Sequence, residues 1–354
     1  VVTVQPSSVG AVIKVRPLAG QGPADFATAM RADRVAAHLR VPVEVQPGSP
    51  DGLVTLTARW RDPMRDLAPL TDVPAWSGDW AALPLGTDES GATVTMPLAN
   101  VSGTVVGGLP GGGKSASIAT ALAPLLADDR VQFCVFDGKG GSDWAWMQDR
   151  AALFNNDDED LAAVADQLES LVAVMRWRLQ NMRRLRGGSS IWNTGGLTAD
   201  LPLMCVLVDE CQTYLDKGNI PRGDKDREAA RQRCEAALAT LVRKGRSVGV
   251  WVVLTTQKPT SDSLPSTIGA NASTAIALRV KTAAAEVAIF GEGVEEGEAS
   301  ARDLPAVPGY AVMGTEDGAR RRFRFGYLPE DRLESLAQDS AGLARPHLLA
   351  PPAT

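Results

Sequence analysis

The sequence predicts an α/β protein with a mostly parallel central sheet, preceded by a small α+β domain. Three observations support this: a series of short, wholly apolar runs, helical spacing between them, and a glycine-rich loop after the first run. Strands that are apolar throughout are typical of a parallel sheet covered by helices on both faces. The predicted strands are Thr104–Gly107, Val131–Phe136, Leu203–Val208, Val248–Thr255 and Thr274–Val280.

The longest helical pattern runs from Asp158 to Arg186, between the second and third predicted strands. Acidic residues lie near its start and three arginines near its end, so that both ends complement the helix dipole. The arginines could instead bind an anion. The apolar stripe of this helix comprises Leu161, Val164, Leu168, Val172, Met175, Leu179 and Met182.

These patterns divide the chain into three regions. Residues 1–76 are expected to form the small α+β domain, in which strand-like segments at 10–18 and 52–60 flank a helical segment at 24–40. Residues 77–330 form the main domain, entered through a linker at 77–100. The Ala- and Pro-rich end, 331–354, is predicted to be a flexible tail.

Composition restricts the classes of function. Hydrophobic residues make up 44% and charged residues 22% of the 354 residues, as in ordinary globular proteins. No apolar run approaches the roughly 18 residues that cross a bilayer, and no signal peptide is present. The four cysteines lack C-x-x-C spacing and there are only two histidines, which argues against a zinc site or a His-based triad. The cysteines fit a reducing compartment.

The net charge of −6 argues against a protein whose whole surface binds nucleic acid, but it allows DNA binding confined to a pore or groove. The chain begins with Val on a strand-like run, Val1–Val4, rather than with Met. We therefore expect a fragment of a longer protein, whose preceding part could carry a membrane anchor. On that expectation the full-length protein is cytoplasmic, at the inner face of the cell membrane.

The most informative motif is a full G-x-x-x-x-G-K-[ST] sequence between a predicted strand and a predicted helix. Its glycines allow backbone N–H groups to form a phosphate cradle at a helix N-terminus. Lys114 would reach the β- and γ-phosphates, and the Ser115 hydroxyl would bind Mg²⁺. ATP and Mg²⁺ are therefore the predicted cofactors, with a glycine-rich turn that binds nothing as the alternative. The predicted ATP-binding residues are Gly108, Leu109, Pro110, Gly111, Gly112, Gly113, Lys114, Ser115 and Ala116.

A second motif is an apolar strand that ends in two acids, Asp209 and Glu210. Burying carboxylates is costly unless their charges have a role. Asp209 is predicted to hold Mg²⁺ together with Ser115, and Glu210 to orient and polarise the water that attacks ATP. Either acid alone could instead be a helix N-cap.

Two further features follow predicted strands. Gln257 comes directly after Val248–Thr256 and could sense the γ-phosphate, or be an ordinary polar strand end. Asp137 and Lys139 follow the second strand, where they could pair at the edge of the site or form a turn. The combination predicts a motor ATPase that hydrolyses ATP to ADP and phosphate.

At this point the motifs resemble those of the FtsK/SpoIIIE family of DNA translocases, which is related to conjugative coupling proteins. The segment FDGKGG is similar to the family's I-D-x-K-G strand end, and VLVDECQTYL to its Walker B segment. The most specific block is RKGRSVGVWVVLTTQKP, which resembles R-x-x-G-I-x-L-x-x-A-T-Q-R-P and is followed by Ala-Asn. The resemblance covers residues 83–312, about two-thirds of the chain.

The resemblance implies a RecA-like motor domain that assembles as a homo-oligomer, a hexameric ring, around double-stranded DNA. By position, Gln257 matches the sensor glutamine and Arg246 the arginine that completes the neighbouring subunit's site in trans. Where family members often carry basic residues, Gly269 and Ala275 stand instead. Nothing after Leu328 is long enough for a winged-helix module, so the resemblance implies DNA binding without sequence specificity.

The combination of a small N-terminal domain with this motor resembles actinobacterial plasmid-transfer proteins more than chromosome-segregation proteins. DNA translocation in conjugative plasmid transfer is therefore the leading function. The alternatives are a chromosome-segregation translocase and an ATPase of the type VII secretion kind, which moves proteins. A third hypothesis keeps ATP as a structural ligand only, but the combination of Lys114, Asp209 and Glu210 argues against it.

Overall fold

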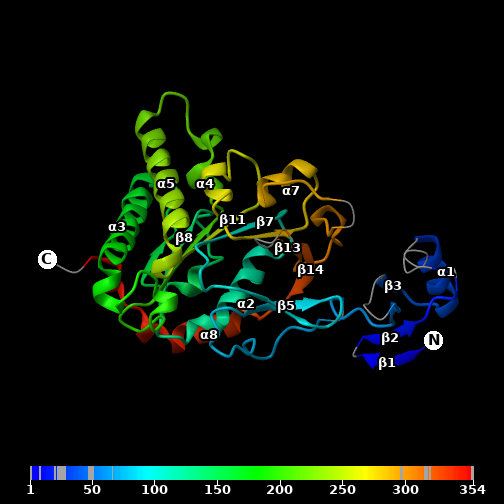
Figure 1. Cartoon of the computed structure of the whole chain (residues 1–354). Coiled ribbons are helices and arrows are strands. Elements are labelled where there is room, and N and C mark those ends of the chain that lie inside the picture. The colour runs from blue at the N-terminus through cyan, green and yellow to red at the C-terminus, as the bar shows by residue number, and fades with distance from the viewer. Residues whose placement is uncertain are drawn as a thin grey trace. The chain divides into compact units, whose positions relative to one another are not determined.

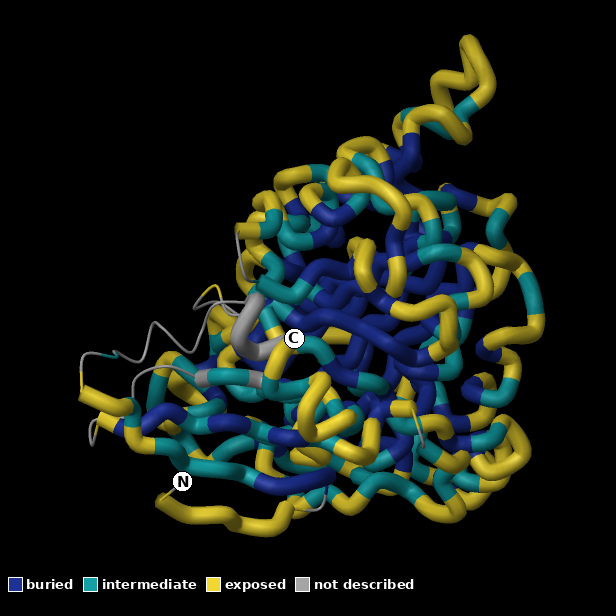
Figure 2. The backbone as a smooth tube through the Cα atoms, turned by 90° about the vertical axis from the view of Figure 1, so that its right-hand side faces the viewer, coloured by how far each residue is buried: buried dark blue, intermediate teal, exposed yellow. Residues whose placement is uncertain are grey.

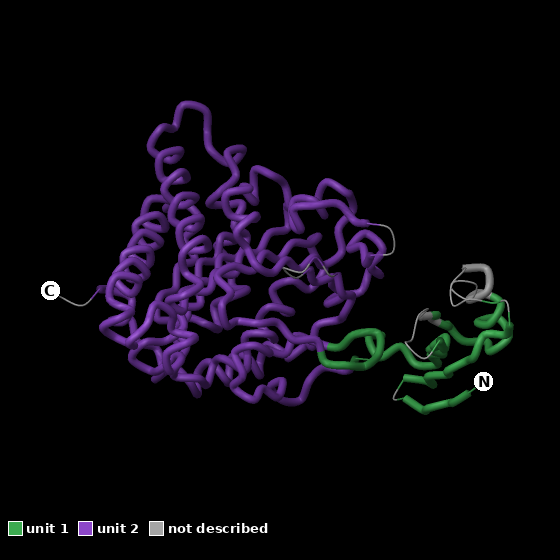
Figure 3. Tube along the Cα trace, in the orientation of Figure 1, with its two compact units in different colours: residues 1–67, 87–93 green, residues 68–86, 94–354 purple. Residues whose placement is uncertain are grey.

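The computed structural model of the chain describes residues 2–7, 9–19, 21, 29–46, 52–65, 67–295, 298–314, 318 and 320–351. Two compact units make up the chain (Figure 3). The smaller comprises residues 1–67 and 87–93, and the larger residues 68–86 and 94–354. The smaller unit thus ends its first segment at Leu67, nine residues before the boundary expected from the sequence, and the expected linker at 77–100 contains two strands of the larger sheet.

The smaller unit is a four-stranded antiparallel sheet with the order β1-β2-β4-β3 and one helix. Its strand β4 alternates between buried and half-buried positions, because one face of the sheet packs inward. The first five residues of the helix expected at 24–40 lie outside the described residues. The elements are β1 (Thr3–Ser7), β2 (Gly10–Val15), α1 (Ala29–Leu39), β3 (Val43–Gln46) and β4 (Val54–Arg59).

The larger unit is built on a ten-stranded sheet with the order β6-β5-β14-β13-β12-β7-β11-β10-β8-β9. The six strands from β12 to β9 are parallel, and β13 and β14 add antiparallel pairs, which confirms the predicted mostly parallel sheet. The strands are β5 (Leu83–Asp88), β6 (Thr93–Met96), β7 (Gly103–Gly107), β8 (Val131–Asp137), β9 (Leu153–Asn155), β10 (Leu203–Asp209), β11 (Val250–Thr256), β12 (Thr274–Leu278), β13 (Tyr310–Gly314) and β14 (Arg320–Phe325).

Helices cover this sheet. The long helices α3 and α5 pack side by side, and α2 packs against α8 (Figure 1). The α-helices are α2 (Lys114–Leu126), α3 (Leu161–Arg186), α4 (Gln212–Leu215), α5 (Lys225–Lys244), α6 (Ser266–Gly269), α7 (Ala283–Phe290) and α8 (Glu330–Asp339). Short 3-10 turns are η2 (Ala145–Met147), η3 (Ile191–Asn193), η4 (Lys217–Asn219), η5 (Arg246–Val248), η6 (Ala301–Asp303), η7 (Ala341–Leu343) and η8 (Pro346–Leu349).

The core lies around the central strands. Every residue of β7, β8, β10 and β11 is buried, as the continuous apolar runs predict (Figure 2). All four cysteines are buried free thiols, and burial raises the pKa of Cys134 to about 12. These thiols act as small hydrophobic side chains.

Helix α3 shows how local sequence sets an element's limits. The carboxylate of Asp160 accepts a hydrogen bond from the Ala163 N–H at its start, and Gly187, in the left-handed region with φ of 75°, ends it. Its buried face differs from the expected stripe at one position. Leu179 is 37% exposed, and Arg178 takes the buried position instead.

The C-terminal region is ordered as far as the structure describes it, whereas the sequence predicts a flexible tail from residue 331. Helix α8 buries Leu333 and Ala337, which are four residues apart on one face, and packs on α2. Beyond it, the Gln132 side chain donates to the carbonyl of Leu343 and accepts from the N–H of Arg345. Apolar spacing in α8 and this glutamine therefore hold a segment whose composition suggests a loose end.

Within the part of the chain that the structure describes, no helix combines the length and apolar character that crossing a bilayer requires.

Candidate active site

The strand order brings the separate sequence motifs to one edge of the sheet. Strand β11 lies between β7 and β10 and is parallel to both. The glycine-rich loop follows β7, Asp209 ends β10 with Glu210 directly after it, and Gln257 follows β11. Because the carboxyl ends of parallel strands meet at one edge, motifs far apart in sequence face each other there.

The loop Gly108–Gly113 joins β7 to helix α2. Gly111 and Gly113 have φ of 76° and 84°, in the left-handed region that side chains disfavour. The Gly108 N–H donates to the carbonyl of Thr256 and the Leu109 N–H to that of Arg279, which fixes the loop to the neighbouring strands. No side chain caps the start of α2, so its first N–H groups face the loop as anion-binding donors.

Lys114 is buried beside the two acids at the end of β10, Asp209 and Glu210. Its exposed fraction is 4%, and its Nζ lies 2.6 Å from Glu210 Oε1 and 3.6 Å from Asp209 Oδ1. A buried ammonium is costly without anionic partners. The cation at the head of α2 is therefore neutralised by carboxylates in this arrangement, and phosphate oxygens would compete for the same position.

The carboxylate of Asp209 is held from three sides. Its Oδ2 accepts from Trp144 Nε1 at 2.7 Å and from the Ser115 hydroxyl at 3.4 Å, while its Oδ1 accepts from the Thr255 hydroxyl. Hard oxygen ligands suit Mg²⁺. The hydroxyl of Ser115 and the carboxylate of Asp209 are oxygen donors of this kind and would hold such an ion.

Glu210 has a strained backbone, and its carboxylate is held by hydrogen bonds. Its φ of 47° lies in the left-handed region, which non-glycine residues occupy mainly where function or tight packing requires it. Its Oε2 accepts from Gln212 Nε2 at 2.5 Å and from the Gln257 N–H at 3.1 Å. The Thr256 hydroxyl in turn donates to Gln212 Oε1 at 2.7 Å. The end of β11 thus contacts Glu210 both directly and through Gln212.

Asp137 ends β8 next to Asp209 in the sheet register. Its Oδ1 accepts from the Lys139 N–H, while the Lys139 ammonium lies 2.7 Å from Asp143 Oδ2. Asp137 and Lys139 thus form a turn and do not pair with each other through their side chains. Asp137 Oδ2 is buried and has no hydrogen-bond partner among the described residues. Burial raises the pKa of Asp137, and the charge of Asp209 raises it further.

Arg246 is not part of this cluster. It lies in η5, before β11, and therefore at the opposite edge of the sheet from the glycine-rich loop. Its Nη2 donates to the Ser273 hydroxyl at 3.1 Å, and its carbonyl accepts from Trp192 Nε1 at 2.6 Å. Arg243 and Lys244 lie nearby, at the end of α5. Within one subunit, Arg246 and Lys114 thus lie at opposite ends of the parallel strands.

A cavity of about 250 Å³ lies against the glycine-rich loop and is lined by Leu109–Gly112 on that side. Its walls are mainly proline and aliphatic side chains from the segment before β13, with Tyr310 and Arg279. A pocket with apolar walls and a few polar groups suits the base and sugar of a nucleotide.

Three residues around the acids escaped the sequence analysis: Trp144, Gln212 and Thr255. Trp144 comes from the turn after β8 and is fully buried. Its indole carries no periodicity or motif signal. Gln212 follows the two acids directly and Thr255 ends an apolar strand, and their role becomes visible only when β10 and β11 are paired.

Comparison with known families tests the resemblance. Residues 68–208 match the FtsK/SpoIIIE family. This part of the chain is therefore similar to that family. The matched part includes the glycine-rich loop and runs to the last residue before Asp209, so the resemblance inferred from the motifs is confirmed.

Related sequences come from two kinds of protein. The DNA translocase FtsK of Haemophilus influenzae is 24% identical over 324 residues, covering 80% of this chain and 56% of that protein. Protein Tra of Streptomyces lividans is 26% identical over 289 residues, covering 79% and 43%. The chain therefore spans about half the length of these relatives.

Solved structures show the fold. The pCW3 conjugation coupling protein TcpA, in its monomer form with ATPγS, aligns with a TM-score of 0.69 at 18% identity, covering 97% of this chain and 92% of that one. The cytoplasmic domain of the type VII secretion ATPase EccC of Thermomonospora curvata aligns with a TM-score of 0.61 at 20% identity, covering 83% and 34%. The predicted RecA-like α/β fold is confirmed.

Proposed function

We propose that this chain binds and hydrolyses ATP and uses the energy to move double-stranded DNA. One observation carries the ATPase part: two strands that are not neighbours, β7 and β10, place Lys114 and Ser115 against Asp209 and Glu210 at a helix N-terminus. A site that only held ATP with Mg²⁺ would use Asp209 but would need no second buried acid, Glu210, beside the phosphate cradle.

Each side chain has a distinct task in this proposal. The loop N–H groups and Lys114 bind the β- and γ-phosphates. Ser115 and Asp209 hold Mg²⁺, which when bound draws charge from the phosphate oxygens. Glu210 accepts a proton from the attacking water, while its contacts to Gln212 and the Gln257 N–H fix its orientation. The cavity beside the loop receives the base and ribose.

The ion pair between Lys114 and Glu210 determines the order in which ATP binding and water activation occur. With their atoms 2.6 Å apart, Lys114 neutralises the carboxylate that must act as a base. Phosphates that recruit Lys114 would release Glu210 to bind water. Nucleotide binding thereby prepares the base for hydrolysis.

DNA as the cargo rests on the relatives. FtsK of H. influenzae is a DNA translocase, TcpA is a conjugation coupling protein, and Tra of S. lividans is related over most of this chain. We place this chain in conjugative plasmid transfer, as a homo-oligomeric and hexameric ring around DNA without sequence specificity. The full-length protein would work at the inner face of the cell membrane. The likeness to EccC keeps protein transport as the second candidate.

The test is the ATPase rate with and without linear double-stranded DNA, measured over a salt series. We expect severalfold stimulation that is equal for scrambled duplexes and falls steeply with salt, because phosphate contacts dominate such binding. A preference for one DNA sequence above about a hundredfold would contradict non-specific binding. Stimulation by a helical peptide, with none by DNA, would favour protein transport.

A further inference from the structure

Helix α3 buries a guanidinium at the edge of the sheet opposite the nucleotide site. Arg178 is 2% exposed, and its Nη1 donates to the carbonyls of Pro202, Val248 and Gly249 at 2.7, 3.2 and 3.4 Å. Pro202 directly precedes β10, and Val248 and Gly249 are the two residues before β11. One nitrogen of the guanidinium therefore ties α3 to the start of two strands.

The rest of this guanidinium lacks a counter-charge. Among the described residues, no carboxylate pairs with Arg178, and no hydrogen bond leaves its Nε or Nη2. Burial lowers the pKa of Arg178 to about 10. A buried charge without an ionic partner is costly, and guanidinium groups bind carboxylates through two parallel hydrogen bonds.

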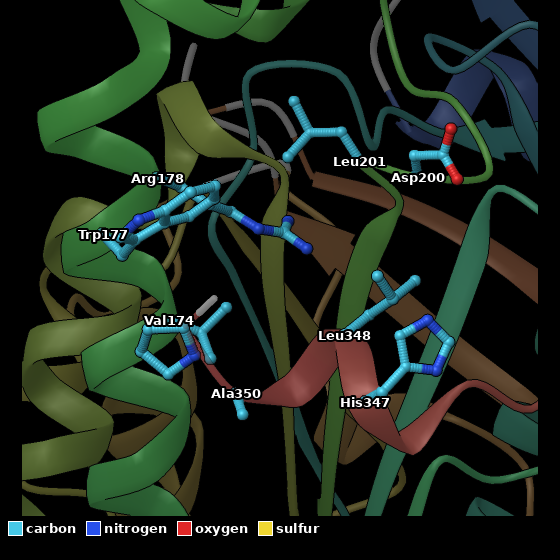
Figure 4. A pocket seen from close by; sticks show the side chains of 9 residues that line it. Val174, Trp177, Arg178, Asp200, Leu201, His347, Leu348 and Ala350 are labelled. Atoms are coloured by element: carbon cyan, nitrogen blue, oxygen red, sulfur yellow. The ribbon is translucent and has the colours of Figure 1, made fainter. Parts of the chain in front are cut away.

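The free side of Arg178 lines a cavity of about 360 Å³ (Figure 4). Val174, Leu201 and Leu348 provide apolar walls, Trp177 a half-buried aromatic one, and Asp200 and His347 are exposed at the rim. The guanidinium extends between the aliphatic side chains of Leu201 and Leu348 (Figure 4). The cavity thus combines one unpaired buried cation with mostly apolar surroundings.

We propose that this cavity binds a carboxylate joined to an apolar body, with the carboxylate on Arg178 and the body against Val174, Trp177 and Leu348. The ligand is a small apolar acid or the C-terminal residue of a partner peptide, which share this chemistry. The site is separate from the proposed ATPase function, because it lies at the other edge of the sheet.

A phosphate suits this cavity less well than a carboxylate. A phosphate dianion needs several charged donors, and the cavity offers one guanidinium. Asp200 at the rim repels any anion, and it repels a phosphate dianion more strongly than a singly charged carboxylate. Apolar walls favour contact with an alkyl or aryl group, whereas a phosphate would lose part of its hydration shell against them.

The experiment uses ligand-observed NMR with 4-phenylbutyrate and its neutral amide, 4-phenylbutyramide, on the whole chain. We expect the acid to bind at least about tenfold more tightly than the amide, since one charge-assisted bidentate contact is worth about that much or more. A second pair of probes is N-acetyl-Ala-Ala-Phe with a free or an amidated C-terminus. If the free-acid peptide binds more tightly than 4-phenylbutyrate, the ligand is a peptide C-terminus; the reverse order indicates a small acid. Equal affinity of acid and amide in both pairs, or no binding of either free acid, would overturn the proposal.

Two variants locate the site. Leu348→Trp should fill the cavity and abolish binding of the acid, while the ATPase rate stays unchanged because the change is remote from the glycine-rich loop. Arg178→Lys keeps the charge but loses the planar fork, so it should weaken acid binding at least tenfold. Acid binding that survives Leu348→Trp in a folded protein, judged by an unchanged melting temperature, would place the ligand elsewhere and refute the assignment.

Discussion

At the residue scale, the site combines one buried ammonium group with two buried carboxylates. Lys114 pairs with Glu210 and lies near Asp209, and Asp209 is in turn held by Trp144 and Thr255. The motifs predict the lysine and both acids, because hydrogen bonding and charge leave few residue types for those tasks. Trp144 could not be predicted, since an indole donor leaves no pattern in the sequence. The same holds for Arg178, where the helical period allows an apolar stripe that includes Leu179 instead.

Replacing Lys114 with alanine tests the phosphate role. Lys114→Ala removes the one cationic side chain in the loop, and we expect ATP turnover below about a tenth of the wild-type rate. The exposed Lys217→Ala serves as the matched control and should leave turnover unchanged. The measurement is phosphate release at saturating ATP and DNA. Turnover above that limit would remove Lys114 from the role.

Replacing Glu210 with glutamine separates water activation from binding. Glu210→Gln keeps the size and one acceptor but loses the base, so we expect hydrolysis to fall by at least about 10²-fold. ATP affinity should be equal or higher, because Lys114 then lacks its ionic competitor for phosphate. Calorimetry with ATP and Mg²⁺, alongside phosphate release, measures both. A collapse of nucleotide affinity would instead assign Glu210 to the metal shell, and the exposed Glu334→Gln should behave as wild type.

At the element scale, the sequence pattern predicted the strands that are buried on both faces and the half-buried β2 and β4, but it missed half-buried elements of the larger unit. The five apolar runs correspond to β7, β8, β10, β11 and β12, because a strand covered by helices needs apolar residues throughout. Strand β14 has the sequence RRRFRF, in which only Phe323 and Phe325 are apolar, so its alternation is too short to distinguish a half-buried strand from a loop. Helix α8 escaped for a similar reason, since its short apolar face is set in an Ala- and Pro-rich region.

The ordered end of the chain can be tested through Leu333. This side chain is 3% exposed in α8, which packs on α2 directly after the glycine-rich loop. Leu333→Ala should lower the free energy of unfolding by about 2–5 kcal/mol, the range for buried leucines. Chemical denaturation followed by circular dichroism measures it, with the exposed Glu334→Ala as the control. If Leu333→Ala unfolds at the same denaturant concentration as wild type, the segment is the flexible tail that the composition suggests.

At the scale of the whole molecule, one subunit assembles an ATP site but leaves a predicted catalytic residue outside it. The sheet places Lys114, Asp209 and Glu210 at the carboxyl ends of the strands, and Arg246 at the amino end of β11. No rotation of a side chain spans a strand of seven residues. The motifs predict that the glycine-rich loop and the two acids form one site, but a single sequence does not show which subunit contact would bring Arg246 to it.

Arg246 therefore tests the ring itself. An arginine that acts in trans stabilises the transition state only when a neighbouring subunit is docked, and such arginines contribute about 10³-fold or more in rate. The alternative is a local role, since its Nη2 donates to Ser273 and its carbonyl accepts from Trp192. A local role predicts that Arg246→Ala lowers the melting temperature and scarcely alters turnover per folded subunit.

The decisive experiment mixes two inactive variants. Arg246→Ala and Lys114→Ala should each be inactive alone, and together they should regain part of the activity, because some interfaces then pair an intact glycine-rich loop with an intact arginine. A ring that needs several competent sites would make this recovery small, so the ratio of the two variants is varied and the recovery should peak at intermediate ratios. Full activity of Arg246→Ala, at concentrations where the wild type is stimulated by DNA, would remove the residue from this role. Arg243, one turn earlier at the end of α5, and Arg279, beside the loop, would then be the next arginines to replace.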